Sequence, residues 1–198
     1  VLQLTNGEFI NAVFPTLLER AFAAVCSKSG DPSKGGWLAQ RADQAIVNLA
    51  PTANNYVNCS SFYHGDNGSF RALKGKFAAC HFLMLDDLGT KVDLDRFEDF
   101  DLSWLLETSP GNYQAGIIFD KPIIEGAEAE RLLNTLIDAN LCDAGAKQPL
   151  ARWARMPVAI NGKPAYQGES GAPFQCRLID WRPEQRYSPE AIVEGLHL

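Results

Sequence analysis

The sequence predicts an α+β fold, because strand-like apolar runs are mixed with amphipathic helical segments. The clearest run, at residues 82–85, ends in the adjacent acids Asp86 and Asp87, and Gly89 follows. A short apolar run that stops at turn residues indicates a buried strand. Two carboxylates near the core repel each other, so such a pair either shares a proton or holds divalent cations. We therefore expect a site that binds hard metal ions.

Residues 1–50 are expected to form a helical N-terminal part. Thr5 and Glu8 have the spacing of a capping box. Apolar residues then recur at helical spacing as far as Val25, and Pro15 is expected to kink or restart this helix. The next segments are a predicted loop at 27–36 and a predicted second helix at 37–49.

Strands dominate the next part of the chain, and a polar, basic loop at 64–76 separates the first two. A late helix is expected over 125–141, because leucine and isoleucine recur there on one stripe. After a loop, a basic segment at 151–163 precedes a last strand. The predicted strands are 56–62, 77–85, 103–106, 113–119 and 174–181.

The composition is ordinary for a globular protein, with 198 residues, 46% of them apolar and 21% charged. No run approaches the roughly 20 apolar residues that a membrane span needs, and no secretory signal is visible, so we expect no membrane partner. A net charge of −6 argues against a generic phosphate-coating DNA binder, which would be basic. Any nucleic-acid contact must therefore come from local basic positions or from parts outside this sequence.

The five cysteines have wide gaps and include no CxxC pair, so neither a zinc ribbon nor a disulfide framework is expected. Cys59 and Cys80 lie in apolar runs, where a free thiol acts as a small core residue. A reducing cytoplasm fits this pattern. The chain begins with Val1 rather than methionine, which favours a piece of a longer protein.

The acid pair needs an irregular strand to act as one site. Neighbouring side chains on a regular strand point to opposite faces, so Asp86 and Asp87 converge only if the strand ends or bulges there. Gly89 indicates such a break. The alternative is an ordinary turn in which Asp87 hydrogen-bonds the backbone. Asp143, which follows the late helix, is by itself more typical of a helix end or turn.

Two further segments carry polar groups suited to an anion. The loop at 107–114, ETSPGNYQ, offers backbone N–H groups and short polar donors for a phosphate, although an ordinary hairpin turn is the alternative. The basic segment at 151–163 includes two arginines, an amide and a lysine, which would suit a polyanion, or would form a surface basic patch: Arg152, Arg155, Asn161 and Lys163. Arg71 and Lys74, in the loop at 64–76, are secondary candidates for phosphate contact.

Histidine and tryptophan supply weaker signals. His64 is expected to be a polar loop residue, and His81, inside a strand, a hydrogen-bonded core histidine. Trp104 and Trp153 are expected to pack in the core rather than to stack on bases.

The set of segments resembles the archaeo-eukaryotic primase superfamily, and within it the replication primases and primase-polymerases of plasmids and phages. The matching pieces are FLMLDDLG, ETSPGNYQAG, LCDAG and RMPVAINGK, within residues 56–181. The resemblance implies one primase-polymerase catalytic domain over 1–198, with 56–181 as its core. It also implies an α/β lobe beside a lobe like an RNA-recognition motif, with the active site between them.

The implied activity is that of a nucleotidyltransferase, with template-directed primer synthesis in plasmid or phage DNA replication. Its partners would be a single-stranded DNA template, nucleoside triphosphates (dNTP or NTP) and a fused or separate helicase. Two Mg²⁺ or Mn²⁺ ions would stabilise the attacking and leaving oxygens. The implied site residues are Asp86, Asp87 and Asp143 for catalysis and metal binding, Ser109, Asn112 and Gln114 for the incoming nucleotide, and Arg155, Asn161 and Lys163 for phosphates or the strand.

The chain departs from the superfamily pattern in two places. Its first acids are adjacent, as in plasmid primases, whereas much of the superfamily has acid-x-acid. Gln114 stands where the second motif commonly carries a histidine. Two other functions stay open: a two-metal nuclease or phosphodiesterase, which three carboxylates would serve equally well, and a non-catalytic nucleic-acid-binding replication module.

Overall fold

The computed structural model describes residues 4–146 and 148–198; residues 1–3 of the predicted N-terminal part and residue 147 lie outside the described residues. The helices are α1 (Asn6–Val13), α2 (Ala42–Ala45), α3 (Gly126–Asp138) and α4 (Pro189–Gly195), with 3₁₀ turns η1 (Ile46–Asn48), η2 (Lys74–Lys76), η3 (Leu94–Phe97), η4 (Ala144–Ala146), η5 (Pro149–Ala151) and η6 (Pro164–Tyr166). The strands are β1 (Ala21–Lys28), β2 (Gln40–Arg41), β3 (Asn54–Tyr63), β4 (Phe77–Leu88), β5 (Trp104–Ser109), β6 (Asn112–Ile123), β7 (Trp153–Arg155), β8 (Ile160–Asn161), β9 (Phe174–Gln175), β10 (Arg177–Trp181) and β11 (Arg186–Tyr187).

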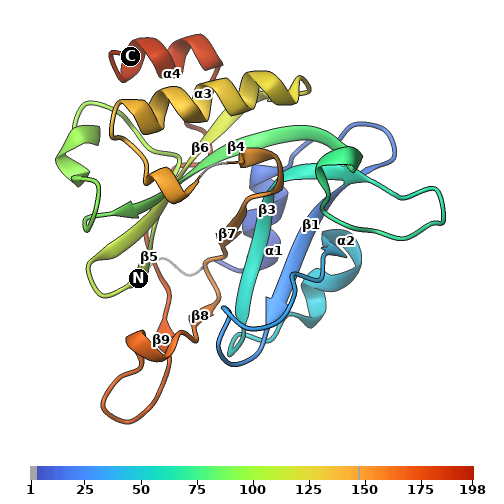
Figure 1. The fold of residues 1–198 in the computed structure, drawn as a ribbon, viewed down its shortest axis with the longest axis vertical. Helices are drawn as coiled ribbons and strands as arrows, with labels where there is room; N and C mark the ends of the chain where they lie inside the picture. The colour runs from blue at the N-terminus through green and yellow to red at the C-terminus, as the bar shows by residue number, and fades with distance from the viewer. Residues whose placement is uncertain (1–3, 147) are drawn as a thin grey trace.

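One large sheet carries the fold, in the strand order β10-β5-β6-β4-β3-β1-β2. All pairs along this path are antiparallel, while β11 pairs in parallel with β6, and β7 adds to β3. The sheet curls, and α3 and α4 lie together at one end of the molecule (Figure 1). The predicted α+β class is therefore confirmed.

The predicted central elements are present, because each has a strong local pattern. β4 is buried continuously from Ala78 to Leu85, and β6 from Gln114 to Phe119. The predicted segments 56–62, 77–85 and 113–119 lie in β3, β4 and β6, and all but the first residue of 103–106 lies in β5. The helix predicted at 125–141 is present as the shorter α3, and the last predicted strand is split into β9 and β10.

The N-terminal part is not the helical unit that was predicted. The capping box at Thr5 and Glu8 is present, but α1 ends at Val13, before Pro15. Residues 21–28, predicted as helix up to Val25, form β1 and pair with β3 along their length. A run that is apolar on all sides matches the helical period as well as the strand period, and pairing with a distant strand decides the outcome. The segment predicted as a second helix at 37–49 likewise contains β2, α2 and η1.

The core fixes the β5–β6 hairpin that borders the site. Trp104 is buried, with its ring 5.2 Å from Phe9 and 4.9 Å from Phe82 between centroids, in edge-on contacts. Its indole lies directly over Gly116, where any Cβ would overlap the ring. The glycine is therefore needed for strand β6 to pass under the tryptophan.

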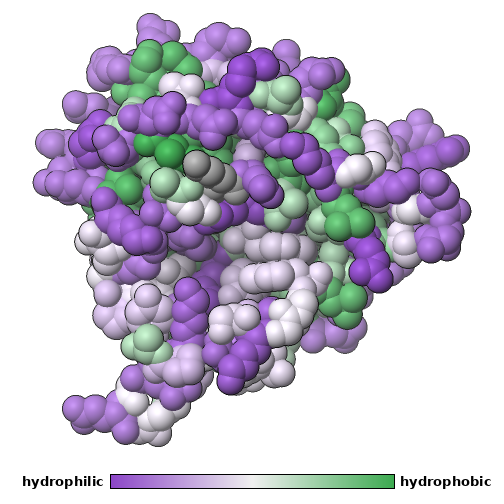
Figure 2. Space-filling view, in the orientation of Figure 1, coloured by the Kyte–Doolittle hydropathy of each residue, from purple (hydrophilic) through white to green (hydrophobic). Residues whose placement is uncertain are grey.

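The cysteines and the surface agree with a globular protein. All five cysteines lie in the described residues, where they are buried and free, and the predicted core positions of Cys59 and Cys80 are confirmed. Among the described helices, none has the length and apolar character that crossing a membrane requires. The face seen in Figure 2 is mostly hydrophilic around a paler central region.

Candidate functional site

The two adjacent acids sit on a β-bulge. In the β4–β6 pairing, Leu85 faces Ala115 and Leu88 faces Tyr113, so two residues of β4 stand opposite the single Gln114. Asp87 has a positive φ of 57°, which breaks the strand alternation. Both carboxylates consequently reach one side of the sheet. The bulge that the sequence predicted is therefore present.

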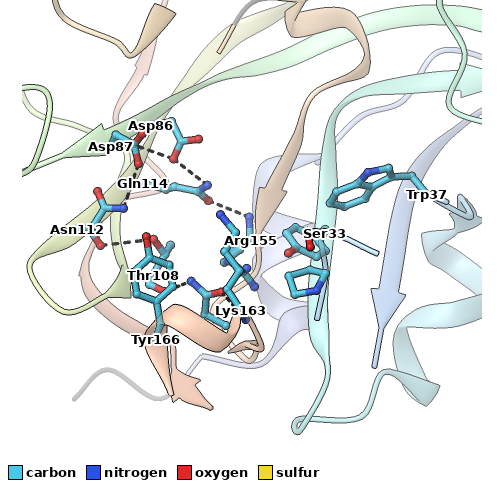
Figure 3. A pocket seen from close by; sticks show the side chains of 13 residues that line it. Ser33, Trp37, Asp86, Asp87, Thr108, Asn112, Gln114, Arg155, Lys163 and Tyr166 are labelled. Carbon is cyan, nitrogen blue, oxygen red and sulfur yellow. Dashed lines mark hydrogen bonds between the residues drawn. The ribbon is translucent and has the colours of Figure 1, made fainter. Parts of the chain in front are cut away.

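The bulge opens into a cavity of about 260 Å³ between the curled sheet and the β1–β2 loop (Figure 3). Several predicted site residues from distant segments meet there, together with others that the sequence did not single out. The lining residues are Pro32, Ser33, Trp37, Tyr56, Asp86, Asp87, Thr108, Asn112, Gln114, Arg155, Asn161, Lys163 and Tyr166.

Two amides of β6 hold the two acids. Gln114 Nε2 donates to Asp86 Oδ1 at 3.1 Å, and Asn112 Nδ2 donates to Asp87 Oδ1 at 3.0 Å. Gln114 Oε1 in turn accepts from the backbone N–H of Arg155 at 3.0 Å, which ties β6 to β7. These side chains, predicted to handle a nucleotide, thus orient the carboxylates in this structure.

Lys91 links Asp87 to the third predicted acid. Its Nζ lies 2.8 Å from Asp87 Oδ2 and 3.2 Å from Asp143 Oδ1. Hydrogen bonds to these acids raise the pKa of Lys91 above its usual value. Burial would raise the pKa of Asp87, but hydrogen bonds from Lys91 and Asn112 outweigh it and leave this pKa lowered. Asp87 is therefore ionised at neutral pH.

Arg152 closes the cluster from the other side. Its Nη2 lies 3.0 Å from Asp86 Oδ2, and its Nη1 donates to the carbonyl of Gly145 at 2.7 Å. The N–H of Gly145 donates to Asp143 Oδ2 at 2.9 Å. Asp143 is thus joined to the other acids, although it does not line the cavity. Within residues 4–146 and 148–198, no three acidic, histidine or cysteine side chains form a ready-made metal-ligand group; basic partners join these three instead.

The three acids nevertheless have the chemistry that a divalent cation needs. Carboxylate oxygens are hard ligands, the kind preferred by Mg²⁺ and Mn²⁺. The side chains of Asp86, Asp87 and Asp143 are 23%, 24% and 20% exposed, so ions from solvent can reach them. A bound ion would have to displace Lys91 and Arg152 from the carboxylate oxygens that they now contact.

The basic segment contributes one buried and one accessible cation. Arg155 is 4% exposed and donates to the carbonyl of Ile160 at 2.6 Å and to Asn161 Oδ1 at 2.9 Å, so its guanidinium supports the cavity from within. Asn161 Nδ2 donates to the carbonyl of Thr108 at 2.7 Å, which joins this segment to β5. The exposed Lys163 makes no ion pair in the part of the chain that the structure describes. Lys163 is therefore the lining cation best placed to meet an anion.

The segment ETSPGNYQ forms a tight hairpin with Ser109 paired to Asn112. The N–H of Gly111, which a phosphate cradle would use, instead donates to Glu107 Oε1 at 3.0 Å. Glu107 is also paired with Arg177 of β10. The hairpin alternative therefore describes the backbone here, and the segment contributes through its side chains.

Besides Asp143, three predicted site residues lie outside the cavity lining. Ser109 is buried, and the preceding Thr108 lines the cavity in its place, because successive strand residues point to opposite faces. Lys74 Nζ lies 2.6 Å from Glu130 Oε1 of α3, so its charge is engaged elsewhere. Arg71 is exposed on the loop at 64–76.

The two weaker histidine predictions are partly confirmed. His64 Nδ1 lies 2.9 Å from the carbonyl of Gly68 within its loop, away from the cavity. His81 is buried with Nε2 3.0 Å from Ser61 Oγ, but its Nδ1 has no partner among the described residues. Burial lowers the pKa of His81 to about 4.

The site also contains residues that sequence reasoning missed or left unassigned. Ser33 comes from the predicted loop at 27–36, Trp37 from the start of the predicted second helix, and Lys91 from the turn after the acids. The sequence carried no separate signal for Trp37, which stood at the start of the predicted second helix. Arg152 was predicted, with Arg155, to suit a polyanion, but it pairs with Asp86 instead.

Comparisons with known proteins identify the family and the fold. Residues 20–197 match the family described as RepB DNA-primase N-terminal domain. The fold is similar to the AEP domain of the primase-polymerase of cyanophage S-2L, with 13% identity, a TM-score of 0.60 and 95% of each chain covered. It is also similar to the catalytic domain of primase RepB′ in complex with initiator DNA, at 18% identity and a TM-score of 0.62, covering 97% of this chain and 91% of that one. A second structure, of primase RepB′, is similar at 17% identity and a TM-score of 0.62, covering 98% of this chain and 61% of that one. No curated protein sequence matches the chain.

Proposed function

This chain belongs to the RepB DNA-primase N-terminal domain family, a family of replication primases, and from this premise we propose that it performs template-directed nucleotidyl transfer with two divalent metal ions. The observation that carries the proposal is the link between two acids that line the cavity, Asp86 and Asp87, and a third acid beside it, Asp143. Asp86 and Asp87 share a bulge, and Asp143 is joined to them through Lys91 and Arg152. This arrangement brings hard oxygen ligands from two separated segments to one place.

Asp86, Asp87 and Asp143 are the residues that would hold Mg²⁺ or Mn²⁺. When bound, such ions stabilise the charge on the attacking and leaving oxygens of phosphoryl transfer. Gln114 and Asn112 would keep the carboxylates in place, since each amide already donates to one of them.

Lys163 would bind the phosphates of a nucleoside triphosphate. It lines the same cavity as the acids and has no competing ion pair among the described residues. Lys91 and Arg152 now offset the charge of the acids, so releasing them would accompany cation binding and would set its strength. Arg155 supports this side of the cavity rather than contacting solvent.

DNA is the proposed polymeric partner. One structural relative is a complex with initiator DNA, which supports a single-stranded DNA template here. A fused or separate helicase is a further proposed partner, on the strength of the family alone.

Primer synthesis on a single-stranded template tests the proposal, with labelled ATP or dATP and either Mg²⁺ or Mn²⁺. We expect Asp86→Ala and Asp143→Ala to abolish the product while thermal unfolding stays cooperative, because each removes a metal ligand but no core contact. Asp99→Ala is the matched control, since Asp99 is an exposed acid outside the cavity. Normal primer extension by either site variant would contradict the assignment.

The same assay separates the other functions. A labelled DNA strand that is shortened by Mn²⁺ without nucleotides would point to a nuclease. Lengthening that requires nucleotides supports the primase. If neither metal ions nor nucleotides shift the melting temperature, the chain is a non-catalytic module.

A further inference from the structure

Trp37 is exposed at the wall of the cavity that faces the acids. It is 46% exposed, an unusual state for a tryptophan, although it lines the same cavity as Asp86 and Asp87. In Figure 3 the acids lie on one side of the cavity and Trp37 on the other, with Arg155 and Ser33 between them. The cavity therefore has an ionic end and an aromatic end.

The indole is held in place by its neighbours. Trp153 stacks on it with centroids 5.8 Å apart and planes 13° apart, and Tyr56 contacts it edge-on at 4.8 Å. Lys28 Nζ lies 4.5 Å from the ring centroid and also donates to the carbonyl of Pro32 at 2.6 Å. A rigid, partly exposed ring loses little conformational entropy when a planar ligand stacks on it.

The two ends of the cavity match the two parts of a nucleotide. Phosphates require cations and metal ligands, which lie at the end formed by Asp86, Asp87 and Lys163. A nucleobase presents a flat π-face, which stacks on aromatic side chains whichever base it is. We propose that Trp37 is the platform on which the base of a nucleoside triphosphate stacks while its phosphates occupy the acidic end. This inference rests on the proposed function, and it adds a binding residue from the N-terminal part of the chain.

Binding of dATP and of inorganic tripolyphosphate, each with Mn²⁺, tests the inference by calorimetry. Tripolyphosphate has the phosphates without a base, so it reports the ionic end alone. We expect Trp37→Ala to weaken dATP binding about tenfold or more, as loss of one base–aromatic stack does, and to leave tripolyphosphate binding unchanged. Trp37→Phe should retain most of the affinity, because phenylalanine still offers a π-face. Leu38→Ala is the matched control: Leu38 is the exposed neighbour of Trp37 and does not line the cavity.

Tryptophan fluorescence supplies a second measurement, the extent of quenching at saturating dATP, which does not depend on affinity. The sequence has four tryptophans. Trp37 belongs to the exposed large apolar side chains, whereas Trp104 is buried. We expect dATP to quench the emission of the wild-type protein and of Leu38→Ala, and the quenching to be largely lost in Trp37→Phe although that variant still binds.

Three outcomes would overturn the inference. Equal dATP affinity of Trp37→Ala and wild type removes Trp37 from the site, and equal losses for dATP and tripolyphosphate assign it a structural role. Weakened binding of a single-stranded oligonucleotide with unchanged dATP binding would assign the stacked base to the DNA strand. In these cases the proposed function stands. If the wild-type protein binds neither dATP nor tripolyphosphate, the proposed function fails as well.

Discussion

Replacing Gln114 by glutamate tests the geometry of the acid cluster most directly. Gln114 Nε2 donates to Asp86 Oδ1 at 3.1 Å, and the side chain is buried. The variant removes this donor and places a second carboxylate oxygen against Asp86. The acceptor role of Gln114 toward the N–H of Arg155 is kept, so the change acts on the acid alone.

The size of the effect follows from distance and protonation. Two unit charges about 4 Å apart repel by about 4 kcal/mol at an effective dielectric constant of about 20. The loss of stability cannot exceed the cost of protonating one of the two acids, because a protonated acid no longer repels the other. Protonating a glutamate of pKa about 4.3 costs about 4 kcal/mol at pH 7 and about 1 kcal/mol at pH 5, at 1.36 kcal/mol per unit. We therefore expect Gln114→Glu to lower the free energy of unfolding by about 4 kcal/mol at pH 7 and by about 1 kcal/mol at pH 5.

Urea unfolding of the wild type and the variant at both pH values measures this difference. Gln44→Glu, which adds a carboxylate at an exposed position of α2, is the control and should change little at either pH. Mn²⁺ should reduce the difference in unfolding free energy between wild type and variant at neutral pH if the acids bind cations, because a divalent ion offsets the added charge. A loss of stability that is the same at both pH values would refute the proposed contact with Asp86.

Further predictions concern the core, one histidine and the counter-ion of the acids. Gly116→Ala should cost about 3 kcal/mol in urea unfolding, because its Cβ would overlap the Trp104 ring, whereas Gly75→Ala meets nothing and should be neutral; equal stabilities would contradict this packing. Burial lowers the pKa of His81 from 6.5 to about 4, so the unfolded chain binds a proton in this window that the folded chain does not, and stability falls as the pH falls. His81→Gln should therefore flatten the stability curve between these pH values, and an unchanged slope would count against it. Lys91→Gln should lower the melting temperature in EDTA and enlarge the shift caused by Mn²⁺, since it frees two carboxylates; shifts matching the wild type in both buffers would exclude Lys91 as their counter-ion.

The local sequence pattern was sufficient to predict the central strands of the sheet and the position of the acids at the end of one of them. β4 and β6 are long buried runs, and two neighbouring acids after Leu85 face the same way only if the strand ends or bulges there. A break in the strand was therefore predictable from the two adjacent carboxylates and the glycine after them, and the pairing of β4 with β6 makes this break a bulge. The α3 helix was equally clear, because its apolar stripe has the helical period.

The roles of the polar side chains around the acids could not be read from the chain. Gln114 and Arg155 look like ligand-binding groups in a sequence, yet one holds Asp86 and the other is buried among carbonyl and amide oxygens. Whether a donor meets a ligand or a neighbouring strand depends on which segments lie opposite it.

The sequence by itself determined the strands with continuous apolar runs, the α3 helix and the bulged acid pair, because each depends on residues within one short segment. Only the tertiary structure decided that 21–28 is a strand, that Lys91 and Arg152 join Asp143 to the other acids, and that Trp37 forms the far wall of the cavity. These outcomes depend on pairing and contact between segments far apart in the chain, whose free energies no local pattern contains.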